Sequence, residues 1–409
     1  MRIVVQKFGG TSVANVECMR QVQQRVQASL NKGYKVVAVL SAMAGETNRL
    51  LDQAKQWSLR PDPAELDVLV STGEQVSVAL FAMLLKDNGI KARSLLGFQA
   101  GIRTDAMSGH ARILAVDADR ITAWLHEYDV LVVAGFQGWD PIDRITTLGR
   151  GGSDTSAVAL AAALKAESCD LFKDVEGIYT ADPNICAKAR KLEHISYEEM
   201  LEMAGMGAKV LQIRAVGFAM NHNVPLRVRC TFNDEPGTLL TKEETGMESM
   251  VVTGIAYDKN QARVTLLDLK DKPGIAAAVF SPLAAAGVLV DMIVQNASWD
   301  GLTDITFTVP TASLDKTKGV LASLADLVNP DKIITDLNVA KISAIGVGMR
   351  NHTGVAAKVF ETMKAERINV LMISTSEIKL TCLIEEKYAE LAVRSLHTAF
   401  GLDKKEEYV

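Results

Sequence analysis

The sequence predicts an α/β protein with a mainly parallel central sheet, followed by two smaller α+β modules. Up to about residue 245, short apolar runs alternate with amphipathic stretches, a pattern typical of parallel strands joined by helices. After residue 250 the predicted strands and helices become shorter, and a stretch of sequence occurs twice. The length of 409 residues agrees with two or three domains.

Composition and charge exclude several classes of protein. Hydrophobic residues make up 48% of the chain, which is ample for sizeable cores. The five cysteines lack disulfide or metal-site spacing, so we expect reduced thiols. The formal net charge of −5 and the absence of basic runs argue against a nucleic-acid partner. We see neither a signal peptide nor an apolar run of transmembrane length, and we expect a cytoplasmic protein without a membrane partner.

Three strand ends in the first part carry residues suited to ligand binding. The first predicted strand, 3–8, places Lys7 beside Gly9 and Gly10, and a helix over 13–32 follows. The second, 36–40, leads into small and hydroxyl residues, and the segment 71–74 is predicted to open a helix over 75–86. These last two junctions supply Ser41, Thr47 and Glu74 as candidate site residues.

The most informative stretch is 147–156, which follows an apolar strand at 130–135. Gly149, Gly151 and Gly152 allow a tight turn and a close approach to a ligand, and 153–155 are predicted to cap the next helix. A helix N-terminus favours a bound anion, and Arg150 suits a carboxylate. The stretch therefore predicts an anion site.

The remaining elements complete the first part. Predicted strands are 93–96, 113–116, 170–174 and 224–229; predicted helices are 118–128, a helix after a Ser-Glu capping box at 196–205, and one that carries 207–212. A glycine turn at 175–184 carries Tyr179 and Asn184.

The second part contains an internal repeat. Residues 274–280 match 354–360 at an offset of 80 (354 − 274), and the same offset pairs the following strands. Each copy reads strand, glycine-initiated helix, two strands, helix and strand. The second copy lacks its last strand, and we predict that 251–256 supplies it. The predicted domains are therefore 1–245, 262–338, and a discontinuous one of 250–257 plus 339–409.

Five motifs together resemble the aspartokinase family of the amino-acid kinase fold: KFGGTS at 7–12, SAMAGETN at 41–48, STGEQ at 71–75, TTLGRGGSDTS at 146–156 and GAKVLQ at 207–212. The repeated modules look like ACT modules, which are ferredoxin-like amino-acid sensors. The resemblance covers essentially the whole chain. It implies a three-layer kinase domain followed by two ACT modules.

The resemblance implies phosphorylation of the side-chain carboxylate of L-aspartate by ATP with Mg²⁺, the first step toward lysine, threonine and methionine. The implied catalytic residues are Lys7, Asp154 and Lys209. The implied substrate-binding residues are Ser41, Thr47, Glu74, Arg150, Gly152 and Ser153. The implied nucleotide-binding residues are Lys7, Phe8, Gly9, Gly10, Lys173, Asp174, Tyr179, Asn184, Lys209 and Val210. No protein side chain is assigned as a metal ligand.

Three positions depart from the family pattern, which usually has Thr at 173, Arg at 184 and Glu at 217. Lys173 and Asn184 lie in the nucleotide segment, and a compensation between them is left open. These departures keep a second hypothesis in view, a non-catalytic amino-acid sensor on a degenerate kinase fold. Another amino-acid kinase is a further alternative, against which the KFGGTS motif and the tandem modules argue.

The resemblance also implies feedback inhibition by lysine and/or threonine, and we expect the two to act in concert. The candidate effector-binding residues are Asp271, Gly274, Ala276, Asp291, Gln295, Asn296, Val355, Ala356, Asn369, Val370, Ser376 and Glu377. A homo-oligomer that pairs through the ACT modules is expected, because strand faces such as 288–294 are highly apolar. A separate regulatory subunit started at Met247 or Met250 remains open.

Overall fold

The computed structural model describes residues 1–207, 210–242, 251–296, 301–325 and 327–404, and divides into two compact units. Of these residues, unit 1 holds 1–179, 191–205 and 210–242. Unit 2 holds 180–190, 206–207 and the residues from 251 onward. A short piece of the first part of the sequence therefore belongs to unit 2.

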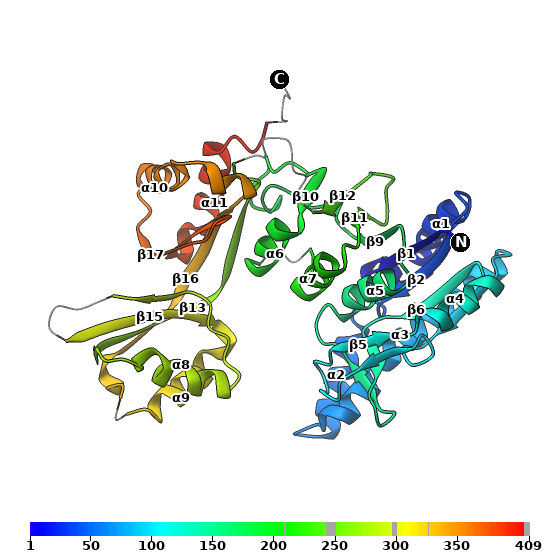
Figure 1. Cartoon of the computed structure of the whole chain (residues 1–409), viewed down its shortest axis with the longest axis horizontal. Helices are drawn as coiled ribbons and strands as arrows, with labels where there is room; N and C mark the ends of the chain where they lie inside the picture. Colours follow the sequence, from blue (N-terminus) through cyan, green and yellow to red (C-terminus); the bar gives the residue numbers. More distant parts are fainter. Residues whose placement is uncertain (208–209, 243–250, 297–300, 326, 405–409) are drawn as a thin grey trace. The chain divides into compact units, whose positions relative to one another are not determined.

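Unit 1 is an α/β domain (Figure 1). Its strands are β1 Ile3–Phe8, β2 Lys35–Leu40, β3 Ala92–Leu95, β4 Ile102–Thr104, β5 Ile113–Val116, β6 Val130–Ala134, β7 Gln137–Trp139, β8 Ile145–Thr147, β9 Ser168–Lys173, β10 His194–Ser196, β11 Leu226–Cys230 and β12 Thr238–Thr241. Its helices are α1 Val16–Leu30, α2 Glu46–Trp57, α3 Pro63–Asp87, α4 Ala118–Glu127, α5 Gly152–Ala163, α6 Tyr197–Gly205 and α7 Ile213–His222.

The central sheet of unit 1 has the strand order β10-β12-β11-β9-β1-β2-β6-β3. All neighbouring pairs are parallel except β11 and β12. The prediction of a mainly parallel sheet is confirmed. A second sheet, in the order β5-β4-β7-β8, was not predicted, because its strands are only three or four residues long.

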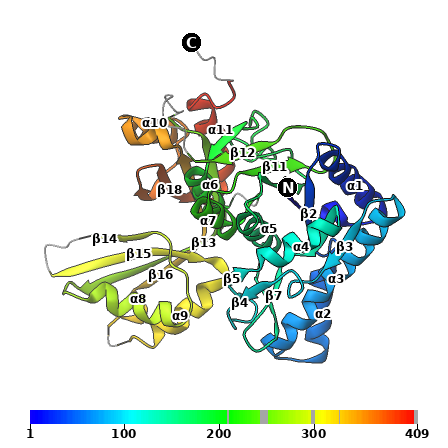
Figure 2. The ribbon, with the colours of Figure 1, turned by 45° about the vertical axis from the view of Figure 1, so that its right-hand side comes forward.

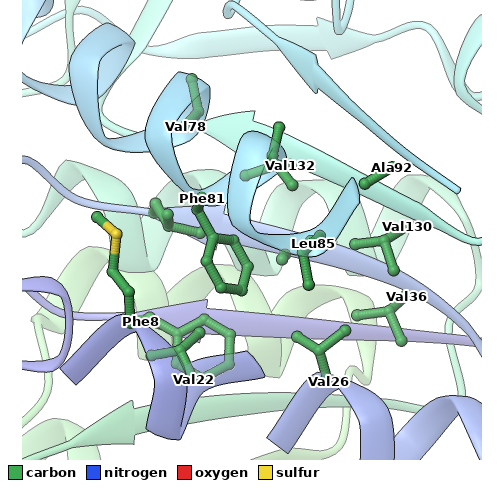
Figure 3. Close-up of a cluster of buried hydrophobic side chains, with 14 of the residues drawn as sticks. Phe8, Val22, Val26, Val36, Val78, Phe81, Leu85, Ala92, Val130 and Val132 are labelled. Atoms are coloured by element: carbon green, nitrogen blue, oxygen red, sulfur yellow. The ribbon is translucent and has the colours of Figure 1, made fainter. Parts of the chain in front are cut away.

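Successive side chains of β1, β2 and β6 point to opposite faces of the sheet and are nearly all buried, so both faces are covered. Val36 and Val132 contribute to a core together with Val22 from α1 and with Phe81 and Leu85 from α3 (Figure 3). The helix α5 contacts β1, β2 and β9 and packs on α7. These layers agree with the predicted three-layer arrangement, and they bring the ends of β1, β2 and β9 to one edge.

The helix α3 corrects a prediction. Residues 71–74 do not open a helix but lie inside α3, which begins at Pro63 after the N-cap Asp62, whose side chain accepts two backbone N–H groups. By length and composition α3 could cross a membrane, contrary to the expectation from the sequence. Its buried residues Val78 and Phe81 instead pack in the core of unit 1.

Two further helix starts differ from the predictions, whereas a third agrees. The helix α5 begins at Gly152 after Gly151 in the left-handed region, so residues 153–155 lie in its first turn and do not cap it. The helix α7 starts at Ile213, not over 207–212. The capping box is confirmed: the Glu199 carboxylate accepts the Ser196 N–H at 3.1 Å, and the Ser196 hydroxyl accepts the Glu199 N–H at 3.2 Å.

Unit 2 contains one antiparallel sheet in the order β14-β15-β13-β16-β18-β17. Its elements are β13 Gly254–Lys270, α8 Ile275–Ala285, β14 Ile293–Gln295, β15 Leu302–Pro310, α9 Leu314–Ala322, β16 Ile333–Ile345, α10 Val355–Ala365, β17 Val370–Thr375, β18 Lys379–Glu385 and α11 Ala389–Ala399. The helices α8 and α9 lie together on one face of β13 and β15 (Figure 2). The helices α10 and α11 cover the β16–β18 half.

The long strand β13 runs through both halves of this sheet. Its second part, 261–270, pairs with β15. Its first part, 254–258, pairs with 341–345 of β16, which in turn pairs with β18. This pairing supports a discontinuous second module that includes the start of β13, and we keep those domain boundaries as a proposal.

The segment 180–190 packs into unit 2. Ala181 and Cys186 belong to the buried cluster that α10 and α11 cover. The Thr180 hydroxyl lies 2.9 Å from Nε2 of the fully buried His397, and the Ile255 N–H donates to the Thr180 carbonyl at 2.8 Å. The chain that leaves β9 is therefore fastened to the second module.

One stability prediction follows from α7. Gly217 lies in the helix interior, and a Cβ atom there would meet only Leu201 Cδ2 at 3.9 Å. We expect Gly217→Ala to raise the free energy of unfolding by about 0.5–1 kcal/mol, since alanine loses less backbone entropy. Urea denaturation followed by circular dichroism measures the change.

Gly151→Ala is the contrasting control for this prediction. Its φ is +70°, and a Cβ atom would lie 1.7 Å from Gln212 Cγ, so this variant should lose stability. An unchanged or lower stability of Gly217→Ala would contradict the account of α7.

Candidate active site

The candidate site is a cavity of about 390 Å³ in unit 1, at the edge where β1, β2 and β9 end. Ten of the predicted site residues line it: Lys7, Gly10, Ser41, Thr47, Glu74, Arg150, Gly152, Ser153, Asp154 and Lys173. These residues come from separate stretches of the sequence. The fold therefore brings the predicted substrate-binding residues into one cavity.

A carboxylate between two lysines forms the buried base of the cavity. Asp154 Oδ1 lies 2.7 Å from Lys7 Nζ, and Asp154 Oδ2 lies 3.0 Å from Lys173 Nζ. Burial alone would raise the pKa of Asp154, but the two lysines outweigh it and lower this pKa to about 2. Burial lowers the pKa of Lys7, opposed by the charge of Asp154. The group is thus an anion that holds two cations at the cavity.

Glu74 is the second carboxylate of the cavity, and it differs from Asp154 in its surroundings. Its Oε1 accepts the Ala42 N–H at 3.0 Å, whereas its Oε2 has no hydrogen-bond partner among the described residues. Burial raises the pKa of Glu74 to about 7, with the Ala42 N–H opposing the shift. An unpaired carboxylate oxygen of this kind suits a ligand's ammonium group.

The glycine turn presents Arg150 to solvent at the mouth of the cavity. Gly149 and Gly151 have φ values of +77° and +70°, which a side chain would strain. At both positions a Cβ atom would also meet neighbouring atoms within 3 Å. Arg150 between them is exposed, so its guanidinium is available for a ligand.

The predicted nucleotide-binding residues do not all reach this cavity. Phe8 is buried and stacks on Phe172 with ring centroids 4.9 Å apart, and the Gly9 N–H donates to the Phe172 carbonyl. Gly9 nevertheless lies near the Lys7 ammonium, since its Cβ position is 3.6 Å from Lys7 Nζ. Asp174 is exposed and Val210 is half-buried, and neither lines the cavity.

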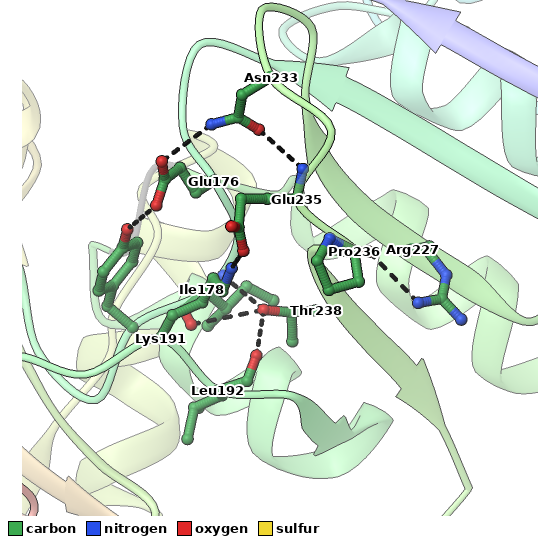
Figure 4. A network of polar contacts seen from close by, with 10 residues as sticks. Glu176, Ile178, Lys191, Leu192, Arg227, Asn233, Glu235, Pro236 and Thr238 are labelled. Atoms are coloured by element: carbon green, nitrogen blue, oxygen red, sulfur yellow. Dashed lines mark hydrogen bonds and ion pairs between the residues drawn. The ribbon is translucent and has the colours of Figure 1, made fainter. Parts of the chain in front are cut away.

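Tyr179 contacts a polar network beyond β9, of which Glu176 and Asn233 are labelled in Figure 4. Its hydroxyl donates to Glu176 Oε2 at 3.2 Å, and Asn233 donates to Glu176 Oε1 at 2.8 Å. Asn184 belongs to unit 2, where its side chain donates to Asp182 at 3.0 Å. Lys209 lies outside the described residues, so its predicted role stays a prediction.

Gly149 and Gly151, predicted to let a ligand approach closely, also line the cavity. The cavity further contains residues that the sequence did not single out: Ala42, Met43, Ala44, Gly45, Asn48, Phe136 and Gln212. Most are neighbours of predicted residues within the same motifs. Gln212 is the N-cap of α7, and its side chain fills the space that the absent Cβ of Gly151 leaves. Its place at the turn depends on a long-range contact that no local pattern signals.

In unit 2 the predicted effector-binding residues lie mostly on the surface. Gly274 and Gly354 precede α8 and α10 with φ values of +92° and +99°, as expected for helix-opening glycines. Asp271, Gln295, Asn296, Ala356, Asn369, Ser376 and Glu377 are exposed; Ala276 and Val370 are half-buried, and Val355 is buried. Exposed positions are compatible with a surface site.

Asp291 and Glu377 were the candidates for the extra anion that a lysine effector needs. Asp291 pairs with the almost fully buried Lys341 of β16, and Glu377 lies 3.5 Å from Arg350. Met292, next to Asp291, packs with Met372 in one cluster, so the two halves of the sheet meet there. Both carboxylates therefore have internal cations, which an effector's ammonium would have to replace.

The chain resembles known proteins along its whole length. Residues 2–230 match the amino acid kinase family, and residues 263–329 and 342–400 each match an ACT domain. An aspartate kinase of Stutzerimonas stutzeri is 54% identical over 404 residues, 98% of each chain. An aspartokinase of Helicobacter pylori is 49% identical over 406 residues, 98% of this chain and 100% of the relative.

The chain belongs to the aspartokinase family. It is an aspartate kinase of amino-acid biosynthesis under allosteric control. This decides against the non-catalytic sensor and against the other amino-acid kinases that the sequence left as alternatives.

Solved structures agree with this assignment. Escherichia coli aspartokinase III in complex with aspartate and ADP, an R-state, matches with a TM-score of 0.82 and 28% identity over 97% of this chain and 99% of that one. The same enzyme with lysine and aspartate, a T-state, matches with a TM-score of 0.76, 29% identity and the same coverage.

The raised pKa of Glu74 leads to a prediction about pH. A neutral Glu74 cannot attract the ammonium group of aspartate, so kcat/KM for aspartate should rise with pH, with a midpoint at about 7, and level off about one pH unit higher. The measurement is a profile of kcat/KM from about pH 6 to pH 8.5. Glu74→Gln, of the same shape, should show low kcat/KM without this rise. A flat wild-type profile, or an unchanged rise in the variant, would contradict the account.

Proposed function

We propose that the chain transfers the γ-phosphoryl group of ATP to the side-chain carboxylate of L-aspartate and forms 4-phospho-L-aspartate. The Lys7–Asp154–Lys173 group, in one cavity with Arg150 and Glu74, is the observation that carries this proposal. A carboxylate nucleophile is ionised at neutral pH and needs no general base. The obstacle is its repulsion from the triphosphate, which fixed cations relieve.

Lys7 is the proposed cation of the transition state. Its ammonium lies beside Gly9 and Gly10 at the end of β1 and is held by Asp154. Asp154 holds the two lysine side chains in place and favours their protonated form. Lys173 adds a second positive charge. Positioning charge in advance, in a buried site, is the main source of catalysis that such a reaction needs.

The substrate is proposed to bind by its two ends. Arg150 binds the α-carboxylate of aspartate, with the N-terminus of α5 at Gly152 and Ser153 beside it. Glu74 receives the ammonium group through its unpaired oxygen. Ser41 and Thr47 line the same cavity and supply further hydrogen bonds.

The nucleotide is proposed to bind next to this cavity, toward the segment that follows β9. The support is the position of Lys173, which lines the cavity at the end of β9, and the resemblance for Phe8, Asp174, Tyr179, Asn184, Lys209 and Val210. The residues described by the structure include no cluster of three potential metal ligands. Mg²⁺ is proposed from the resemblance, and phosphate oxygens and water are ligands that this ion commonly keeps.

Regulation is proposed to occur through lysine and threonine, which bind at the ACT modules and act in concert. The T-state of the Escherichia coli enzyme, solved in complex with lysine and aspartate, supports lysine as one effector. The helix starts at Gly274 and Gly354 suit an α-carboxylate. Asp291 and Glu377 would receive ammonium groups in exchange for Lys341 and Arg350.

We further propose a cytoplasmic homo-oligomer that pairs through the ACT modules. The exposed Leu289 and Ile293 near the edge strand β14 support a partner there. A regulatory subunit started internally stays open. The pathway assignment, toward lysine, threonine and methionine, rests on the family.

A prediction about catalysis concerns Lys7 and Arg150, two of the cations that line the cavity. Lys7→Ala should lower kcat by at least about a hundredfold with little change in ATP affinity, because Lys7 acts mainly in the transition state. Arg150→Ala should instead chiefly raise the KM for aspartate. Turnover is measured as acyl phosphate trapped by hydroxylamine, and near-normal turnover of Lys7→Ala would contradict the proposed mechanism.

A prediction about regulation concerns inhibition by lysine and threonine. Lysine and threonine together should inhibit aspartate turnover more strongly than expected from the inhibition that each causes alone. Gln295→Ala and Glu377→Ala should weaken the inhibition. Activity that neither amino acid nor the mixture changes would refute the proposed regulation, whereas unchanged inhibition of both variants would refute only the assigned residues.

The proposed assembly is tested by light scattering of the same samples, which should give more than a monomer mass. A monomer mass with and without effectors would refute the assembly.

A further inference from the structure

The helix α3 contacts both loops that form the substrate cavity. Toward its middle, Glu74 accepts the Ala42 N–H and so holds the loop that follows β2. Seven residues earlier (74 − 67), Asp67 binds the end of β8, just before the glycine turn. Between them the Ser71 carbonyl accepts Gln137 Nε2 at 3.0 Å, and Gln137 pairs with Thr147 across β7 and β8. One helix therefore contacts the loop after β2 through Glu74 and the end of β8 through Asp67.

Asp67 is a buried carboxylate whose hydrogen bonds all go to the loops around the turn. It is 2% exposed. Its Oδ2 accepts the Thr147 N–H at 3.0 Å, and its Oδ1 accepts the Thr147 hydroxyl at 2.5 Å. Both oxygens also accept the Gly109 N–H, at 3.0 and 3.1 Å. Charge-assisted bonds of this kind are about twice as strong as neutral ones.

These bonds act on the position of Arg150. Thr147 is the last residue of β8, and the turn with Arg150 follows directly. The loop at Gly109 packs against the same turn, since a Cβ atom on Gly149 would lie 2.9 Å from the Gly109 carbonyl oxygen. Arg214 holds the other side, donating to the carbonyls of Leu148 at 2.5 Å and Ala111 at 2.8 Å. Asp67 thus holds the two segments beside the turn by accepting the N–H groups of Thr147 and Gly109.

We propose that Asp67 is a positioning residue of the aspartate site. Through Thr147 and Gly109 it fixes the Arg150 turn relative to Glu74 on the same helix, at an axial separation of about 10 Å between Asp67 and Glu74. The two groups that bind the two ends of the substrate then have a set spacing. The inference rests on the proposed role of Arg150 in binding the substrate carboxylate.

The test is Asp67→Asn, which keeps the shape but places an NH₂ group among N–H donors. The KM for aspartate should rise about tenfold, with the KM for ATP within about twofold, because only the substrate turn loosens. Thr147→Val removes one of the four bonds and should raise the KM for aspartate less. If Asp67→Asn does not fold, Thr147→Val decides alone.

Glu199→Gln is the matched control. Glu199 is also buried, at 3% exposed, and accepts a main-chain N–H and a hydroxyl in the same unit. Like Asp67 it does not line the cavity, but these bonds come from Ser196 of its own capping box and not from the segments beside the Arg150 turn. This variant should lose stability without a change in the KM for aspartate. An equal rise in KM for Glu199→Gln would overturn the inference, since general loosening would then explain the effect.

A double variant separates this inference from the proposed function. If Asp67 acts through Arg150, adding Asp67→Asn to Arg150→Ala should change the KM for aspartate no further. Full additivity would overturn the inference. The inference would also be overturned if Arg150→Ala raises the KM for aspartate whereas a folded Asp67→Asn variant has a normal KM. An Arg150→Ala variant with normal KM would instead refute the proposed carboxylate site.

Discussion

The buried ion group of Lys7, Asp154 and Lys173 is the interaction on which unit 1 depends. The parallel pairing of β1 with β9, with Phe8 beside Phe172, brings two lysines to the same edge of the sheet. Lys7 is buried and Lys173 half-buried. Two such cations repel each other and are costly to desolvate, so an anion between them stabilises the pair. Asp154 provides it from the first turn of α5, which the glycine turn places there. The pairing of β1 with β9 and the start of α5 at Gly152 are thus both needed to place the Asp154 carboxylate between the two ammonium groups.

The connection between the kinase site and the sensor modules is short. Lys173 lines the cavity, and seven residues later (180 − 173) Thr180 is part of unit 2. There its hydroxyl meets the buried His397, and the following residues pack in the core of the second module. A rearrangement of this module on effector binding would therefore act through the chain on the segment after β9.

Much of the fold could be predicted from the sequence, because buried parallel strands are continuous apolar runs. The bounds of β1, β2 and β6 were predicted from such runs. The two modules were predicted instead from the sequence repeat at an offset of 80. The start of α3 was not, since residues 71–74 were interpreted as the opening of a helix, whereas they lie inside α3, with Ser71, Gly73 and Glu74 buried.

The site was predictable where residues lie close together in sequence. The glycine turn and Lys7, near the end of β1, belong to local motifs, and both line the cavity. Asp67 belongs to no motif, because its partners Gly109 and Thr147 are 42 and 80 residues away. The pairing of Asp291 with Lys341 likewise depends on how the sheet of unit 2 brings its two halves together, over 50 residues of sequence.

The role of Asp154 is tested most directly by single-turnover kinetics of Asp154→Asn, with the ATP dissociation constant measured on the same sample. The variant keeps the shape of the side chain but leaves Lys7 and Lys173 without their anion. We predict that the rate of phosphoryl transfer falls by at least about a hundredfold while ATP binding changes only a few-fold. A single-turnover rate close to that of the unmodified chain would contradict the account.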